Sequence, residues 1–255
     1  MVFLYAIIFG IVQGLTEFLP VSSSGHLVLV NRIFGGSGNF LFLSVLLHVA
    51  TLLSVIIVLR KDVKNLICHP FSAQAKKIYL SLLPTIIIVL VFKSAFENAF
   101  NGQYLSICFA ITGFVLLLTC FFSKRAQTNK PISYKTAFFM GVIQGIAVMP
   151  GISRSGSTIA CGMLCGESQE NATKFSFLMS IPVIFASMGY EALKVFKNGT
   201  VIQSSELLPI MIACVFAFFV GMFSIKIMLG IVKKTGLLPF GIYLFVLSIL
   251  TAIFL

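Results

Sequence analysis

The sequence predicts an all-α integral membrane protein, with six transmembrane helices and two re-entrant helical hairpins arranged as an inverted-topology repeat. Three observations lead to this prediction. Of the 255 residues, 58% are hydrophobic and 10% are charged, and the mean hydropathy is +1.07. A polar motif interrupts the apolar chain twice, and the basic residues concentrate in alternate loops. The chain is therefore expected to form a single membrane domain over residues 1–255.

The first hairpin is predicted from two short apolar arms around a polar tip. Residues 1–15 are apolar but too short for the ~20 residues that cross a hydrocarbon core. Glu17, Pro20 and three serines interrupt them, and only residues 27–34 remain before the glycine-rich loop 35–39. Such a segment is expected to enter and leave the membrane on one side.

Six later segments have the composition and length of full spans. Three lie between the two hairpins, and Pro84 is expected to bend or shorten the second of them. A second pair of short arms, residues 137–149 and 159–164, flanks the second polar tip. The six predicted spans are residues 40–59, 78–92, 104–122, 175–190, 207–225 and 237–255.

The two polar tips are copies of one motif, offset by 131 residues. The first reads G-I-V-Q-G-L-T-E-F-L-P-V-S-S-S-G-H-L and the second reads G-V-I-Q-G-I-A-V-M-P-G-I-S-R-S-G-S-T. The first copy holds an acid, Glu17, and an imidazole, His26, whereas the second holds a guanidinium, Arg154. The repeat halves are expected at about 1–125 and 133–255. The matched positions are Gly10, Gln13, Gly14, Ser22, Ser24 and Gly25 with Gly141, Gln144, Gly145, Ser153, Ser155 and Gly156.

The distribution of basic residues sets the expected orientation. The net charge of +11 lies in short loops rather than on a polar face, which excludes a nucleic-acid partner. Loops 60–77, 123–135 and the turn at Lys233 and Lys234 are the most basic, and the positive-inside rule places them in the cytoplasm. The weaker alternate loops contain Lys93 with Glu97, and Lys194 and Lys197 with Glu206.

The number of spans between the hairpins then sets the side of the membrane from which each hairpin enters. With three spans between the hairpins, the first hairpin should dip from the outer side and the second from the inner side, with both termini outside. Paired broken elements of this kind usually meet near the midplane and form a site. The expected location is the bacterial inner (plasma) membrane, and a homodimer is one assembly that such a chain could form.

Arg154 is interpreted as the residue that binds an oxyanion. Its planar fork matches phosphate or carboxylate and stays charged at any relevant pH. The surrounding serines and glycines would let backbone amides approach the same anion. The alternative is a structural arginine that extends to the interface or forms a static ion pair with Glu17.

Gln13 and Glu17, four residues apart and on one helical face, are candidate ligands for Mg²⁺ or Ca²⁺. The alternative is that they only form hydrogen bonds across the hairpins. His26 is the candidate proton carrier, because it follows a serine turn with candidate nucleophiles. His48, in a plain apolar span, is expected to be structural.

The motifs resemble the undecaprenyl pyrophosphate phosphatases of the bacitracin-resistance type. The resemblance rests on Gln13 to Glu17, on F-L-P-V-S-S-S-G-H after it and on P-G-I-S-R-S-G-S-T from Pro150, and it extends to L-H-V-A-T and F-S-F-L-M-S-I-P elsewhere in the chain. It implies a membrane enzyme that hydrolyses undecaprenyl diphosphate to the monophosphate and recycles this lipid carrier for cell-wall synthesis. Gln13 departs from the pattern, because many relatives carry Glu there.

The resemblance also implies roles for single residues. Glu17, Ser23, His26 and Arg154 fall on catalytic positions. A phosphate-contacting or supporting group would comprise Ser22, Ser24, Ser153, Ser155, Gly156 and Thr158. Either Ser23 attacks the terminal phosphorus, assisted by His26, or His26 and Glu17 activate a water, and the sequence leaves both open.

The rival function is transport. Inverted repeats that meet at the midplane are typical of alternating-access carriers, so the same residues could hold a polyprenyl phosphate for flipping. A purely structural scaffold would give no reason for Glu17 and Arg154 to lie inside the bilayer. Release of phosphate from a polyprenyl diphosphate would separate the first two functions.

Overall fold

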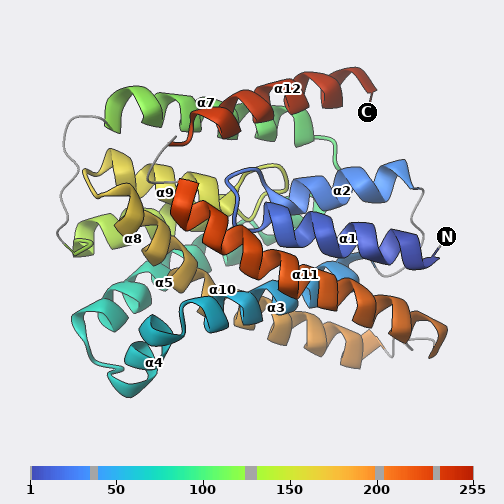
Figure 1. The fold of residues 1–255 in the computed structure, drawn as a ribbon, viewed down its shortest axis with the longest axis horizontal. Helices are drawn as coiled ribbons and strands as arrows, with labels where there is room; N and C mark the ends of the chain where they lie inside the picture. Colours follow the sequence, from blue (N-terminus) through green and yellow to red (C-terminus); the bar gives the residue numbers. More distant parts are fainter. Residues whose placement is uncertain (1, 35–39, 124–130, 199–203, 232–235, 255) are drawn as a thin grey trace.

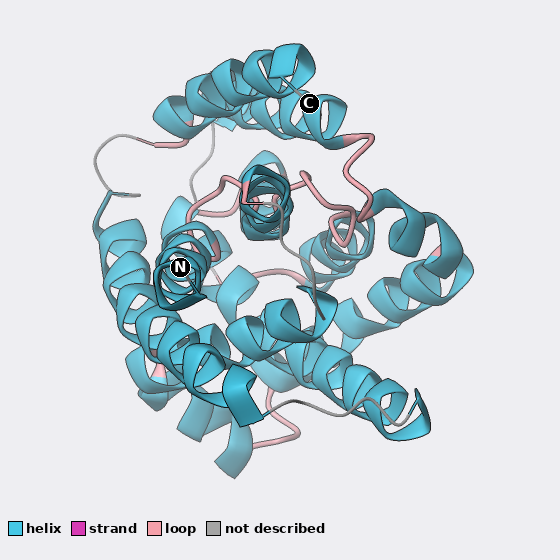
Figure 2. Ribbon diagram, turned by 90° about the vertical axis from the view of Figure 1, so that its right-hand side faces the viewer, coloured by secondary structure: helices cyan, strands magenta, loops and turns pink. Residues whose placement is uncertain are grey.

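The computed structural model describes residues 2–34, 40–123, 131–198, 204–231 and 236–254, and these segments are helical with short turns and no strand (Figure 2). Figure 1 labels most of the helices. In chain order they are α1 (Val2–Thr16), α2 (Ser23–Ile33), α3 (Phe40–Val58), α4 (Arg60–Cys68), α5 (Ala73–Val91), α6 (Lys93–Ala99), α7 (Leu105–Phe122), α8 (Tyr134–Ile146), α9 (Arg154–Leu164), α10 (Gln169–Asn198), α11 (Ser204–Ile231) and α12 (Leu238–Phe254).

The described helices fit a multi-pass membrane protein. Four of them are long and apolar enough to cross a bilayer, namely α5, α7 and large parts of α10 and α11. A fifth span results if α3 and α4, which meet at an angle of 86°, are taken as one bent element. The sixth predicted span corresponds to α12, an apolar helix of 17 residues.

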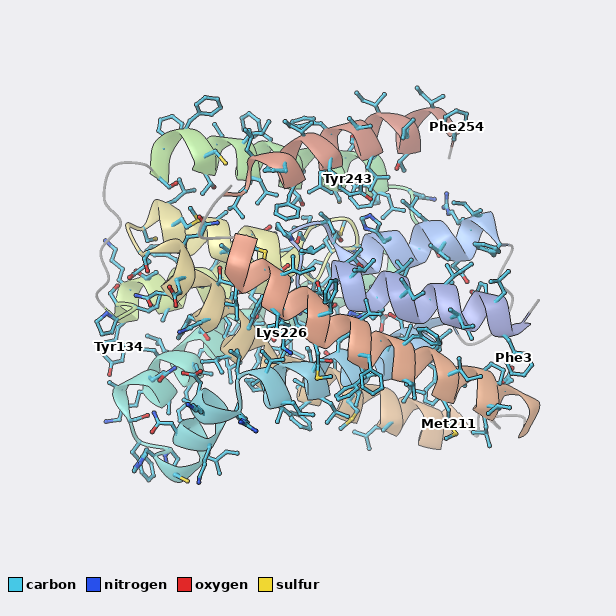
Figure 3. All side chains as sticks on the ribbon, in the orientation of Figure 1. Phe3, Tyr134, Met211, Lys226, Tyr243 and Phe254 are labelled. Carbon is cyan, nitrogen blue, oxygen red and sulfur yellow. The ribbon has the colours of Figure 1, made fainter. Side chains whose placement is uncertain are left out.

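Large apolar side chains cover the periphery of the molecule. Phe3, Met211 and Phe254 project outward, and each of these residues has half or more of its surface exposed (Figure 3). A water-soluble protein rarely exposes so extensive an apolar surface, whereas lipid solvates it without cost.

Several predicted boundaries were wrong in their details. Pro84 does not shorten its span, because α5 begins before the apolar run and continues through the proline. Part of the predicted loop 60–77 is the helix α4, and Lys93 begins another short helix, α6. The second arm of the second hairpin begins at Arg154 rather than at residue 159, because Ser153 caps α9 there. Three of the predicted features lie outside the described residues: loop 35–39, the basic residues within 124–130, and the turn at Lys233 and Lys234.

The 131-residue offset relates helices as well as motifs. It maps α1 onto α8, α2 onto α9, α5 onto α11 and α7 onto α12. The packing follows the same relation, since α1 packs against α11 while its counterpart α8 packs against α5. The first helix of each hairpin therefore packs against a helix of the other half of the chain.

Glycines make this exchanged packing close. A Cβ atom at Gly10 would lie 2.3 Å from the carbonyl oxygen of Ala213 on α11. A Cβ atom at the equivalent Gly141 would lie 2.1 Å from the carbonyl oxygen of Ser81 on α5. Small residues at membrane helix interfaces permit such backbone contact.

The two hairpins approach each other from opposite ends of the molecule. In Figure 1, α1 and α2 extend toward the right and α8 and α9 toward the left, and the chain termini lie at the right-hand end. The antiparallel pair α7 and α12 packs along one side, with α7 against α9. The two polar tips consequently meet in the interior.

Replacing Gly141 by Ala should lower the thermal stability of the protein in detergent, by about 1–3 kcal/mol or more, because the added Cβ collides with the backbone of α5. Gly189→Ala is the matched control, since a Cβ on this residue of α10 meets nothing within 4 Å. Thermal unfolding monitored by circular dichroism measures both. Equal stability of the two variants would contradict the close approach of α8 and α5.

Candidate active site

Two serine-capped helix N-termini form the core of the site. The Ser22 hydroxyl accepts a hydrogen bond from the amide of Gly25 at 3.3 Å, and the Ser153 hydroxyl accepts one from the amide of Gly156 at 3.0 Å. Ser22 adopts φ 69°, a conformation that costs a non-glycine residue free energy and often marks a functional turn. The positive ends of α2 and α9 thus lie at the two tips, where they favour an anion.

The tips contact each other directly. The Ser155 hydroxyl donates to the carbonyl oxygen of Leu19 at 3.0 Å, and a Cβ on Gly156 would lie 3.0 Å from Pro20. Thr112 of α7 supports the second tip, because its hydroxyl accepts from the amide of Ser153 at 3.1 Å. Ser155 and Gly156, which were predicted to contact substrate, therefore also join the two hairpins.

Glu17 lies at the centre of the site and is buried, with 4% of its surface exposed. Its Oε1 pairs with the guanidinium of Arg154 from the second hairpin. Its Oε2 accepts from the Ser23 hydroxyl at 2.5 Å and from the Gln13 amide nitrogen at 3.0 Å. An ionised carboxylate at this depth is tolerated because it is both paired and hydrogen-bonded.

A cavity of about 310 Å³ opens beside these groups. Its polar wall comes from the two tips and from Ser44 and His48 of α3. Its apolar wall comes from α5, α6 and α10, and Lys93 and Tyr190 of the last two helices also line it. The Lys93 ammonium lies 4.9 Å from the centre of the Tyr190 ring. The polar side chains lining the cavity are Thr16, Glu17, Ser22, Ser23, Ser24, Ser44, His48, Lys93, Glu97, Gln144, Ser153, Arg154, Ser155, Ser187 and Tyr190.

Four of the predicted site residues, Gln13, His26, Gly156 and Thr158, do not line the cavity. His26 Nδ1 lies 2.7 Å from the carbonyl oxygen of Ser22, and its Nε2 lies 2.7 Å from the hydroxyl of Tyr243 on α12. Thr158 is fully buried, and its hydroxyl contacts the backbone of Arg154 and the hydroxyl of Ser176 on α10. The structure thus brings together Glu17, Ser23 and Arg154, and it places His26 against α12.

Sequence reasoning missed His48. This residue was expected to be structural, yet its Nε2 lies 3.4 Å from Glu17 Oε2 and its ring lines the cavity. Ser44, His48 and Thr51 recur every three to four residues on α3, so they share the helix face that meets the hairpins. This polar stripe in an otherwise apolar span was the available signal.

Gln13 and Glu17 are the side chains that would supply oxygens to a divalent cation. Gln13 turns its amide nitrogen toward Glu17, and its Oε1 is buried without a hydrogen-bond partner. Within the described ranges, no group of three or more His, Cys, Asp or Glu side chains converges. Two protein oxygens suit a cation that arrives on phosphate and keeps its waters, as Mg²⁺ commonly does, rather than a resident ion in a protein cage.

Comparison with known proteins agrees with this geometry. The family model described as "Bacitracin resistance protein BacA" matches residues 6–250. A protein of Carboxydothermus hydrogenoformans called undecaprenyl-diphosphatase is 39% identical, over 96% of this chain and 94% of its own. A protein with the same name from Christiangramia forsetii is 39% identical, over 98% of this chain and 97% of its own. Another, from Methanococcus vannielii, is 37% identical, over 95% of this chain and 96% of its own.

Arg154→Ala should destabilise the protein by about 3–5 kcal/mol, because it leaves the Glu17 carboxylate buried without its counter-charge. The double variant Arg154→Ala/Glu17→Gln should recover part of that loss, since a neutral amide costs less to bury. The control is Lys174→Ala, which removes an exposed ion pair with Glu170 and should cost at most about 1 kcal/mol. A double variant no more stable than Arg154→Ala in thermal unfolding would show that the unpaired Glu17 charge is not what destabilises Arg154→Ala.

Proposed function

Because the chain belongs to the bacitracin resistance protein BacA family, we infer that it is an undecaprenyl-diphosphatase, a membrane enzyme that releases phosphate from undecaprenyl diphosphate and leaves the monophosphate. One observation carries the chemistry. A buried carboxylate and a guanidinium from opposite hairpins meet in one cavity, with a serine hydroxyl 2.5 Å from the carboxylate. The monophosphate product is the form of the carrier that re-enters cell-wall synthesis.

Substrate binding would change the partner of Arg154. The Arg154 side chain is 18% exposed. Its guanidinium would turn from Glu17 to the diphosphate, which it would bind through two parallel hydrogen bonds. The amides at the starts of α2 and α9, with the hydroxyls of Ser24 and Ser155, would hold the remaining phosphate oxygens. The apolar wall of the cavity would accept the first part of the prenyl chain.

Ser23 is the proposed nucleophile. Its hydroxyl already donates to Glu17 Oε2, so its proton can pass to Glu17 as its oxygen bonds to the terminal phosphorus. The bridging P–O bond breaks, and undecaprenyl phosphate leaves with the electron pair. Water then attacks the phosphorus of the phosphoserine while Glu17 returns its proton to the Ser23 oxygen. Phosphate leaves with both protons of that water, and the Glu17 carboxylate is restored. Phosphoryl transfer depends mostly on positioning and charge stabilisation, which assigns the largest effect to Arg154.

The catalytic role expected for His26 stays a prediction. In this conformation its Nδ1 meets the first tip at Ser22, and its other nitrogen contacts Tyr243. To assist Ser23 or a water directly, the ring would have to leave Tyr243. Direct attack by water, activated by Glu17, remains the alternative mechanism.

We propose that Mg²⁺ or Ca²⁺ accompanies the diphosphate, with Glu17 and Gln13 as the protein oxygens that would hold it. When bound, the cation would neutralise part of the phosphate charge. The Gln13 amide would have to turn its unpaired Oε1 toward the cation.

The inverted-topology repeat is also proposed, on the exchanged packing of α1 with α11 and of α8 with α5. The two chain termini lie at one end of the molecule and the basic helix α4 at the other (Figure 1). With six spans, this arrangement corresponds to termini outside the bacterial plasma membrane and α4 in the cytoplasm. The homodimer remains an expectation, for which chemical cross-linking in membranes would give the measurement.

Purified protein should release phosphate from a polyprenyl diphosphate, and EDTA should abolish the release. Arg154→Ala should lower the rate on the order of 10²–10³-fold or more, and Ser23→Ala on the order of 10- to 1,000-fold. Arg32→Ala is the matched control, because this arginine of α2 contacts the carbonyl oxygen of Asn101 outside the cavity. Full activity of Arg154→Ala would exclude the proposed site.

The same assay separates the alternatives. Binding of the lipid without phosphate release at any metal concentration would favour transport over hydrolysis. Acid-quenched enzyme that carries labelled phosphate, lost in Ser23→Ala, would support the phosphoserine; label that persists in this variant would remove Ser23 as the nucleophile.

Native cysteines test the topology. Cys68 at the end of α4 and Cys165 at the end of α9 are exposed, and the proposed orientation places both on the cytoplasmic side. A membrane-impermeant maleimide should therefore label them in inverted vesicles but not in right-side-out ones. A cysteine introduced as Gln103→Cys in the α6–α7 turn, with Cys68 and Cys165 replaced by Ser, should show the opposite pattern. Labelling of Cys68 in right-side-out vesicles would reverse the orientation.

A further inference from the structure

His48 is one of the polar residues of the cavity that the proposed reaction does not yet use. It lies on α3, outside both hairpins, and so outside the repeated motif. About a quarter of its side chain is exposed, and its Nε2 faces the carboxylate that receives the Ser23 proton. The question is what a ring in that position does during the reaction.

Two contacts of the imidazole ring define its part. Nδ1 lies 2.6 Å from the carbonyl oxygen of Ser44, which can only accept a hydrogen bond. Nε2 lies 3.4 Å from Glu17 Oε2, which also only accepts when the carboxylate is ionised. Both ring nitrogens therefore face oxygen acceptors, and the contact of Nδ1 with Ser44 fixes the direction in which Nε2 points.

Glu17 depends on its contact with His48 Nε2 once the substrate is bound. In the free site, its Oε1 is held by Arg154, while Ser23, Gln13 and His48 surround its Oε2. A diphosphate that takes the fork of Arg154 removes the partner of Oε1. As Ser23 attacks the phosphorus it ceases to be a donor as well, which leaves Gln13 and His48.

We propose that His48 is a positioning residue for the phosphatase reaction: it holds the Glu17 carboxylate on Ser23 while Arg154 is engaged by the diphosphate. This inference rests on the proposed function and on Glu17 as the group that receives the Ser23 proton. In this role, His48 acts through Glu17 and does not touch the substrate. Its loss should consequently lower kcat more than it changes KM.

The test compares two variants of similar size in the purified full-length protein. His48→Leu keeps the packing of α3 but removes the donor, and it should lower kcat on the order of 10- to 100-fold, as is typical when a residue that orients a reactive group is lost. His48→Gln keeps an N–H donor within reach of Glu17 and should restore most of kcat. His69→Ala, an exposed histidine after α4, is the control and should match the wild type. Phosphate release from a polyprenyl diphosphate is measured across substrate concentrations, beside thermal unfolding.

Each outcome decides one question. A kcat loss in His48→Leu that His48→Gln reverses, at unchanged KM and thermal stability, supports the positioning role. Wild-type kcat in His48→Leu, an effect confined to KM, or equal losses in both variants would overturn it. If the wild-type protein releases no phosphate, the proposed function fails, which is a different result from active wild type with an indifferent His48.

Discussion

The ion pair between Glu17 and Arg154 is the contact on which the site depends. Burying either charge alone in a membrane interior costs several kcal/mol, so each hairpin needs the other to neutralise its tip. The pair also keeps the free site neutral at its centre while leaving Arg154 partly accessible from the cavity. An anion that enters can therefore exchange one oxygen partner of Arg154 for another without stranding the guanidinium.

The surrounding helices hold the tips in register for this exchange. Gly10 and Gly141 let the first arm of each hairpin touch a helix of the other half, and Thr112 of α7 fixes the backbone of Ser153. Serine caps then begin α2 and α9 at the tips, where the unpaired amides of the first turn can serve an anion. The fold thus supplies rigidity, and the few polar side chains at the tips supply the chemistry.

The composition was sufficient to predict the helical membrane class, and the family resemblance placed Ser23 among the catalytic residues. The repeated motif was sufficient to predict the meeting of Glu17 with Arg154. It was insufficient for His48 and His26, because the direction of a helical side chain depends on which neighbour packs against that face. His26 follows Ser23 by three residues, yet its ring turns to Tyr243 of α12, a partner that local spacing does not reveal. Helix α4 was missed for a related reason, since its charges resemble those of a loop and its few apolar residues give no span.

The exchanged packing has a consequence for how the protein is made. The arm containing Gly10 leaves the ribosome early, but its partner Ala213 belongs to the penultimate helix. Contacts so distant along the chain form slowly, and the first hairpin must wait in the membrane with Glu17 uncompensated until much later segments insert. Biosynthesis therefore completes the packing of the first hairpin only near its last step, because α1 packs against α11.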